Sequence, residues 1–501
     1  MIWPHLLILG LIGYTSMFGN ISVPNERSRI YMATALVDEG TTSIDSSLER
    51  FGRIGDRAIF QGKHYSDKAP GTGYMGAIIY QVVRIFTEPS EWKIHHLLQL
   101  MRIWICLPLA LLGWFWLRRL LCLYFLSQAT IECTSLGWLL GTAAFHYSGA
   151  FFGHQIAATF LLGSWLWMKR AIDEGGRLAP LFSGLLSGFA VFTEYPAGIG
   201  VVTIGIFGLL HVKELQWRLG LWVLGGVPFA LALMYYHVVC FGHPLALPYQ
   251  HLAAKTYQKI HNAGMAGVTR PEWSGFSLWF LSLKRGLFTT SPLMIYAFFG
   301  WFPLLQKSWR EAVALITLLI MVTLFASGAH IWGGDWGYGP RILVFSLGLL
   351  MIPVAFVIER SLQCVVGRWM TLSLTLYGVL VTQLIHLFFP EPWAKSKNPL
   401  VDVVYPMFKA GITSPNWISV HFSNAGLLST LPVIGAVGFL MIRLSLQVEK
   451  QRKPKTFIAV IITVTLAFCS VTSFPASQPK IQQDWVKLVL LWNEREVRYH
   501  P

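Results

Sequence analysis

Three charged residues near the start of the chain have side chains suited to acid–base and phosphate chemistry. Glu26 follows Pro24 and Asn25, and the stretch "DKAPG" places Asp67 beside Lys68, just before a Pro-Gly pair. A carboxylate can accept the proton of an attacking hydroxyl, and an ammonium group can stabilise a leaving phosphate. Two plainer interpretations compete. Glu26 could merely complement the dipole of a helix capped by Asn25, and Asp67 with Lys68 could be a solvated loop pair.

Further polar residues lie at the ends of apolar stretches. They are Arg102, His146, His154, Glu194, Tyr195 and Arg341. Ionisable side chains at membrane depth usually face a cavity or a partner. For Arg102 and Arg341 the strongest alternative is that the long side chain reaches the membrane interface. Because all of them fall on one face in the topology described next, we predict that they converge there.

The chain that positions these residues is predicted to be an all-α polytopic membrane protein. Its 501 residues are 54% hydrophobic and 13% charged, with a mean hydropathy of +0.53, whereas soluble domains have about 25% charged residues. Apolar runs of membrane-spanning length recur along the chain. About thirteen spans are predicted, near 3–19, 98–117, 135–150, 155–168, 180–194, 196–210, 219–240, 287–305, 311–328, 341–358, 369–389, 425–445 and 456–474.

Positive charge predicts how these spans are oriented. With the N-terminus inside, every short loop on the inner face is basic, as topology rules require. The long segments 20–97, 241–286, 329–340 and 390–424 then lie outside, together with a tail from 475. The net charge of +15 is explained by this pattern and by an anionic lipid surface, so we expect no nucleic acid partner. We interpret 1–20 as a retained first span.

The first outer loop, 20–97, is predicted to hold two interfacial helices, 26–38 and 71–87, with a hairpin between them. The stretch "RAIFQGKHYSD" alternates apolar and polar residues on either side of Gln61-Gly62, which is typical of a hairpin. That hairpin would return Asp67 and Lys68 to the membrane surface. The orientation holds only if 71–87 does not span. We predict one transmembrane domain, 1–474, and an outer amphipathic tail, 475–501.

Five stretches occur in an order that resembles a known family. They are "NERSRIYMATALVDEG", "YSDKAPG", "MRIWICLPLALLGWFWLRRL", "FTEYPAGIG" and "GGDWGYGPRILVFSLGLLMIP". The ordered set resembles the GT-C membrane glycosyltransferases, in the branch of the bacterial lipid A aminoarabinose transferase and the protein O-mannosyltransferases. The resemblance covers the first 110 residues best. It implies a polyprenyl-phosphate sugar donor and transfer on the outer face.

The resemblance also implies roles for single residues. Glu26 matches the second acid of the family's acidic pair, Lys68 the lysine of its Lys-Pro motif, and Arg102 the arginine that opens the next span. Asn25 departs from the family, because relatives usually have the aspartate thought to act as base there. Glu194 lies where relatives often have a lysine.

The sequence therefore predicts an enzyme that moves a sugar from a polyprenyl-phosphate donor to a hydroxyl of a lipid, glycan or protein acceptor. The predicted location is the plasma (inner) membrane, with the active face extracytoplasmic. Glu26 is the first candidate base and Asp67 the second. The predicted phosphate-binding cations are Lys68, Arg102 and Arg341, and the predicted cavity residues are Asn25, Tyr65, His154, Glu194 and Tyr195.

Several alternatives remain open at this stage. One is a polyprenyl-linked glycan polymerase or ligase, and others are a lipid or sugar transporter, a flippase or a non-catalytic scaffold. A transporter should show paired half-chain repeats and charges near mid-span. The requirement for a divalent metal is also open, because the histidines lack a close carboxylate pattern.

Overall fold

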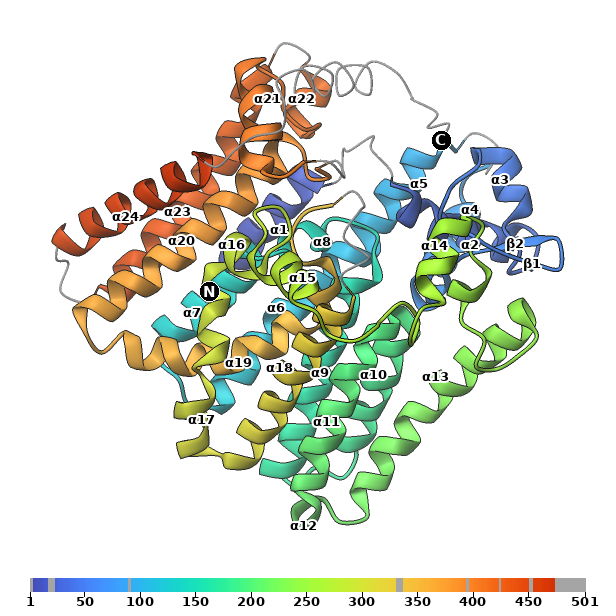
Figure 1. Ribbon diagram of the computed structural model, residues 1–501, viewed down its shortest axis with the longest axis horizontal. Helices are drawn as coiled ribbons and strands as arrows, with labels where there is room; N and C mark the ends of the chain where they lie inside the picture. Colours follow the sequence, from blue (N-terminus) through green and yellow to red (C-terminus); the bar gives the residue numbers. More distant parts are fainter. Residues whose placement is uncertain are drawn as a thin grey trace.

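The computed structural model describes residues 3–16, 23–88, 92–329, 337–392, 396–422, 425–449 and 454–473, which fold mostly into helices (Figure 1). The predicted tail 475–501 lies outside them, so the domain division stays a prediction. The first half contains α1 (Trp3–Ser16), α2 (Pro24–Asp38), α3 (Asp45–Phe51), β1 (Ala58–Phe60), β2 (Lys63–Tyr65), α4 (Gly71–Arg84), α5 (Ile94–Met101), η2 (Arg102–Cys106), α6 (Leu107–Leu123), α7 (Gln128–Gly141), α8 (Ala144–Ser148), α9 (Gly153–Asp173), α10 (Ala179–Thr193), η3 (Tyr195–Ala197), α11 (Gly198–Leu210), α12 (Val212–Leu215) and α13 (Arg218–Phe241). The second half contains η4 (Pro248–His251), α14 (Lys255–His261), α15 (Trp273–Phe276), η5 (Ser277–Leu281), α16 (Leu287–Thr290), η6 (Pro292–Phe298), α17 (Trp301–Lys307), α18 (Trp309–Gly328), η8 (Arg341–Leu343), α19 (Val344–Ser361), α20 (Val365–Phe388), η9 (Leu400–Val404), α21 (Tyr405–Lys409), α22 (Trp417–His421), η10 (Gly426–Thr430), α23 (Leu431–Val448) and α24 (Pro454–Thr472).

Six helical stretches of the described chain are long and apolar enough to cross a membrane. They are Ile94–Leu123, Arg218–Phe241, Trp309–Gly328, Arg341–Ser361, Val365–Phe388 and Gly426–Val448. Each overlaps a predicted span, and the chain is an integral membrane protein. The number of thirteen spans stays a prediction, because other apolar helices, such as α10, are shorter.

The region 287–305 differs from the single span predicted there. It is divided into α16, η6 and α17. Pro292 interrupts the helix because proline lacks the backbone N–H that a continuous helix needs. At Gly300 a Cβ atom would lie 2.1 Å from the carbonyl oxygen of Pro353, so the chain packs closely against α19 at this break.

The centre of the bundle is α9, which packs against α6, α10 and α19. Fully buried tryptophans, Trp114, Trp138 and Trp165, fill the core around it. At the end of α9 away from the first loop, Lys169 forms a buried ion pair with Glu311 at 3.0 Å. The core around α9 is therefore closely packed and apolar, and one buried ion pair lies at its end.

The first loop covers the other end of the bundle. In Figure 1 the elements α2, α3, α4, β1 and β2 gather at the upper right, far from α12 at the bottom. The predicted helices 26–38 and 71–87 are present as α2 and α4, which pack against each other.

One expectation about α2 is wrong. The helix is capped by Val23, with Pro24 in its first turn, so Asn25 is inside the helix and is not the N-cap. Proline suits this position because its missing N–H would have no helical partner there. A continuous run of the helix from Ser28 to Ala35 is buried within the protein, and its position at the membrane interface stays a prediction. By contrast, α4 is amphipathic: Gly73 and Gly76 face α2, while Ile78 is exposed.

Candidate active site

A β-hairpin fixes the position of two carboxylates. Strands β1 and β2 pair antiparallel with Ala58 opposite Tyr65, as the predicted hairpin requires. Gln61 and Gly62 form the turn, with φ of 49° and 79°, the two left-handed residues of a type I′ turn. Continuing the register two residues beyond Ala58 and Tyr65 sets Asp56 opposite Asp67.

Lys68 lies between these two carboxylates. Its Nζ is 2.9 Å from Oδ2 of Asp56 and 3.0 Å from Oδ2 of Asp67. The side chain of Asp67 is 7% exposed, and that of Asp56 is 34% exposed. The Ser28 hydroxyl donates to Oδ1 of Asp67 at 3.3 Å. One carboxylate is therefore enclosed and the other opens toward solvent.

The charges in this group shift the pKa values of its members in opposite directions. Burial and the nearby charge of Asp56 raise the pKa of Asp67, although Lys68 opposes the shift. Burial also opposes ionisation of Asp56, but Lys68, Arg341 and Arg29 outweigh it and hold the pKa of Asp56 below its usual value. Burial disfavours the charged form of Lys68, yet the two carboxylates raise its pKa above the usual value. Lys68 therefore keeps its positive charge between two carboxylates, of which Asp67 is the more basic.

Arg29 connects the start of α2 to the start of α4. Its Nε donates to Oγ1 of Thr72 at 2.9 Å, and Nη1 donates to the Asn25 carbonyl at 2.8 Å. The Asn25 side-chain oxygen also accepts from Arg29. The guanidinium lies over the ring of Phe152, 5.7 Å from its centroid. Asn25 thus holds Arg29 in place beside the carboxylate pair.

Glu26 and Arg102 pair with each other. Both are buried, and Nη2 of Arg102 is 3.0 Å from each carboxylate oxygen of Glu26. The backbone N–H of Phe151 also donates to Glu26, at 2.7 Å. This pair joins α2 to η2 and to the segment before α9.

The remaining predicted residues form the sides of the same region. His154 and Glu194 are 3.1 Å apart, and the Tyr195 hydroxyl is 3.0 Å from Nε2 of His237. Tyr65 packs against Phe241, with ring centroids 5.6 Å apart. Tyr65 therefore supports the hairpin from its apolar side.

The structure brings Asp67, Lys68 and Arg341 together around Asp56. Glu194 belongs to the same group, because it lies close enough for its charge to act on Arg29. The structure pairs Glu26 with Arg102 instead. Sequence reasoning missed Asp56 and the role of Arg29. The sequence did contain a signal for Asp56. Asp56 and Asp67 are equally far from the turn at Gln61-Gly62, so a hairpin centred there places them opposite each other.

A metal site is not formed by three or more His, Cys, Asp or Glu side chains anywhere in the described part of the chain. This observation does not test whether the activity requires a divalent metal.

Comparison with known proteins shows similarity in the path of the backbone and not in sequence. No protein-family model and no curated protein sequence matches the chain. Among solved structures, similar chains include ArnT from Cupriavidus metallidurans bound to undecaprenyl phosphate, at 13% identity and a TM-score of 0.49, covering 93% of this chain and 74% of that one. Another is arabinosyltransferase EmbB from Mycobacterium smegmatis, at 13% identity and a TM-score of 0.45, covering 94% of this chain and 40% of that one.

A third similar structure is the Archaeoglobus fulgidus oligosaccharyltransferase, at 11% identity and a TM-score of 0.48, covering 92% of this chain and 59% of that one. These proteins are GT-C membrane glycosyltransferases, the family that the sequence motifs resemble. The chain spans well under two thirds of the length of two of them. At these identities and TM-scores the similarity assigns neither an activity nor a residue role to this chain.

Proposed function

We propose that the protein is a membrane glycosyltransferase that moves a sugar from a polyprenyl-phosphate donor to a hydroxyl acceptor. One observation carries the proposal: Lys68 lies between Asp56 and Asp67 at one end of a bundle of apolar helices. Transfer from a sugar phosphate needs a cation for the leaving phosphate and a carboxylate for the acceptor proton. This cluster contains both within one hydrogen-bond length.

The reaction follows from these two needs. The acceptor oxygen forms a bond to C1 of the sugar while the bond from C1 to the phosphate oxygen breaks. The electron pair leaves with the polyprenyl phosphate, whose growing negative charge Lys68 and Arg341 stabilise. The acceptor proton passes to the carboxylate. A phosphate entering the cluster would compete with Asp56, the more exposed partner of Lys68.

We assign the base to Asp67 and keep Glu26 as the competing candidate. Its raised pKa makes Asp67 the stronger proton acceptor of the carboxylate pair, and catalytic carboxylates work best when their pKa approaches the working pH. The two oxygens of Glu26 already accept from Arg102 and from the Phe151 N–H. Asp67 is also ion-paired, but it shares Lys68 with Asp56, which can keep the lysine when Asp67 takes up a proton.

The location is part of the proposal. Under the predicted topology the cluster faces the outside of the plasma membrane, where a lipid-linked donor would carry its sugar. The donor's polyprenyl chain would lie in the bilayer beside α4, whose Ile78 and Val82 are exposed on its free face.

The test is a product assay with the purified protein in nanodiscs. Radiolabelled polyprenyl-phosphate sugars would be supplied with membrane extract as acceptor, and both released polyprenyl phosphate and labelled product would be measured. Wild type should release the lipid phosphate, and Asp67→Asn should not. Movement of intact donor across proteoliposomes without release would instead establish a flippase and overturn the proposal.

A further inference from the structure

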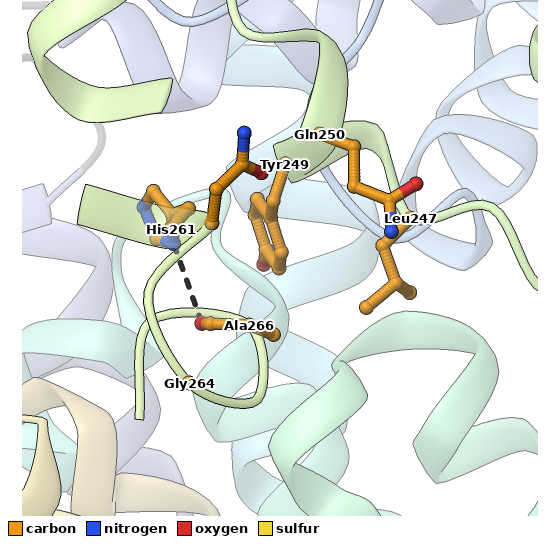
Figure 2. A pocket seen from close by; sticks show the side chains of 7 residues that line it. Leu247, Tyr249, Gln250, His261, Gly264 and Ala266 are labelled. Atoms are coloured by element: carbon orange, nitrogen blue, oxygen red, sulfur yellow. Dashed lines mark hydrogen bonds between the residues drawn. The ribbon is translucent and has the colours of Figure 1, made fainter. Parts of the chain in front are cut away.

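An open polar cavity lies on the segment that is hydrogen-bonded to the carboxylate hairpin. It has a volume of about 360 Å³ and lies on the segment 247–266, which follows α13. Figure 2 shows Tyr249, Gln250 and His261 around it, with Gly264 and Ala266 forming its floor. The lining residues that the structure describes include no Asp, Glu, Lys or Arg. A ligand of this cavity is therefore expected to be neutral.

Two ring contacts fix the shape of the cavity. The rings of Tyr249 and His261 stack, with centroids 4.7 Å apart and planes at 13°. Nδ1 of His261 is 3.4 Å from the Ala266 carbonyl. The turn beyond it is closed by the reciprocal backbone bonds of Met265 and Val268, at 3.0 and 3.1 Å. This cavity is built before any ligand enters.

The cavity is joined directly to the hairpin that carries the carboxylates. Leu252 pairs with Ala58 in an isolated bridge, and the Ala253 N–H donates to the Arg57 carbonyl at 3.0 Å. Arg57 is the neighbour of Asp56 in the chain. On the other side, the Tyr249 ring lies 5.9 Å from that of Tyr195, the neighbour of Glu194. Tyr249 thus lines the cavity and lies close enough to Lys68 and Asp67 for their charges to act on its hydroxyl.

The lining matches the chemistry of a sugar ring. A sugar presents hydroxyl groups along its edge and C–H groups on its faces. The exposed amides of Gln250 and Asn262 each offer two donors and an acceptor for the hydroxyls. The side chains of Tyr249 and His261 add ring surface to the lining for the C–H groups. The volume is at the small end for ligand cavities, which suits one sugar unit.

We propose that this cavity binds a neutral sugar unit of a glycan acceptor and turns one of its hydroxyls toward Asp56 and Asp67. The acceptor assignment rests on the proposed function. The cavity belongs to a loop between apolar helices, whereas the donor's sugar is tethered to a lipid in the bilayer. The water-facing partner of the reaction is then the glycan, and the acceptor is neither a protein segment nor a lipid headgroup.

The first experiment measures saturation-transfer NMR signals from the methyl glycosides of glucose, galactose, mannose and rhamnose added to the protein in nanodiscs. At least one should bind the wild type. Asn262→Ala and Gln250→Ala should each weaken that binding about three- to tenfold, the value of a lost neutral hydrogen bond. Gln363→Ala, an exposed amide substitution between α19 and α20, is the matched control and should bind as wild type does.

Three outcomes would overturn the inference. The first is that no glycoside gives a signal, and the second is that Asn262→Ala and Gln250→Ala bind as wild type does. In the third, Asn262→Ala weakens binding of a labelled polyprenyl-phosphate sugar as well, which would assign the cavity to the donor. Failure of the proposed function has a different signature: glycosides bind through Asn262, but the protein neither binds nor cleaves the lipid donor. The cavity would then remain a carbohydrate site of another activity.

Discussion

Arg102 and Glu26 form a buried two-oxygen ion pair, with Nη2 of Arg102 3.0 Å from both Oε1 and Oε2 of Glu26. Their side chains are 9% and 2% exposed. The pair joins the first loop to the bundle, because α2 carries Glu26 and η2 carries Arg102. A buried charge that loses its partner is costly, whereas replacing both members together often is not. The pair can therefore be tested as a structural unit.

We expect Arg102→Ala to lower the free energy of unfolding by about 3–5 kcal/mol, because it leaves the Glu26 carboxylate buried without a counter-charge. Glu26→Gln should destabilise through the unpaired guanidinium. The double variant Glu26→Gln/Arg102→Gln should recover much of the loss and regain turnover. Denaturant unfolding in detergent, with the product assay alongside, measures both effects.

A different pattern would return these residues to catalysis. If Glu26→Gln folds with wild-type stability and loses turnover by two orders of magnitude or more, and the double variant shows no rescue, Glu26 is the base. If Arg102→Ala is stable and only donor affinity falls, Arg102 binds phosphate.

Lys68→Ala should weaken donor binding about ten- to hundredfold, since a hydrogen bond to a charged group contributes about 1.5–3 kcal/mol. Lys68→Arg keeps the charge and should retain part of the affinity. Binding of fluorescent polyprenyl phosphate to nanodiscs measures the effect. Lys63→Ala, at an exposed lysine that begins β2, is the matched control. Equal affinity in Lys68→Ala and Lys63→Ala would remove Lys68 from the phosphate site.

Turnover should fall as the pH drops through the pKa of Asp67, because only the ionised carboxylate accepts a proton. That pKa lies above the usual aspartate value, owing to burial and to the charge of Asp56. Asp56→Asn removes the second cause, so the acid limb of the pH profile should move to lower pH. Glu49→Gln, at an exposed position of α3, should leave the profile unchanged. A limb that stays in place in Asp56→Asn would assign it to a group other than Asp67.

Gly62→Ala should destabilise the hairpin by about 1–2 kcal/mol, the cost of a left-handed conformation for a residue with a Cβ. Its φ is 79°, and no atom outside the local chain lies within 4 Å of the added Cβ, so strain is the only expected effect. Gln61→Asn should stabilise the same turn, since asparagine accepts that conformation readily. Hydrogen exchange at the Ala58 and Tyr65 amides reports both changes. Unchanged exchange in Gly62→Ala would mean that the turn does not limit hairpin stability.

Cysteines placed at Lys63 and Glu88 should both react with an impermeant thiol reagent from outside, and one at Arg177 only from inside. The expectation follows from α4 covering α2 rather than crossing the membrane. The exposed native cysteines must first be replaced; they are Cys122, Cys364 and Cys469. If the cysteines at positions 63 and 88 are labelled from opposite sides, α4 crosses the membrane and the predicted orientation is reversed.

The local elements were predictable, and their partners were not. The hairpin followed from alternation around Gln61-Gly62, α2 from a charged amphipathic stretch that starts at Pro24-Asn25, and α4 from a short apolar run. The sequence also identified Lys68 and Asp67 by type. Nothing local, however, reveals that Glu26 meets Arg102, because the pair is separated by most of the first loop and closes only when α2 packs beside α5. The division of 287–305 into three short helices has a local signal in Pro292, whereas the close contact of Gly300 with α19 does not.

Two glycines pack closely against the end of α10, Gly71 from the first loop and Gly153 from the start of α9. A Cβ at Gly71 would lie 2.7 Å from the Phe192 carbonyl oxygen, and one at Gly153 would lie 2.3 Å from that of Thr193. In a library that samples every substitution, both positions should tolerate almost nothing, because backbone would have to move. In the segment 247–266 only Pro248 and Leu252 are buried, so its other positions should accept wide variation. Directed evolution of acceptor preference can therefore concentrate its diversity in that segment and leave the two glycines untouched.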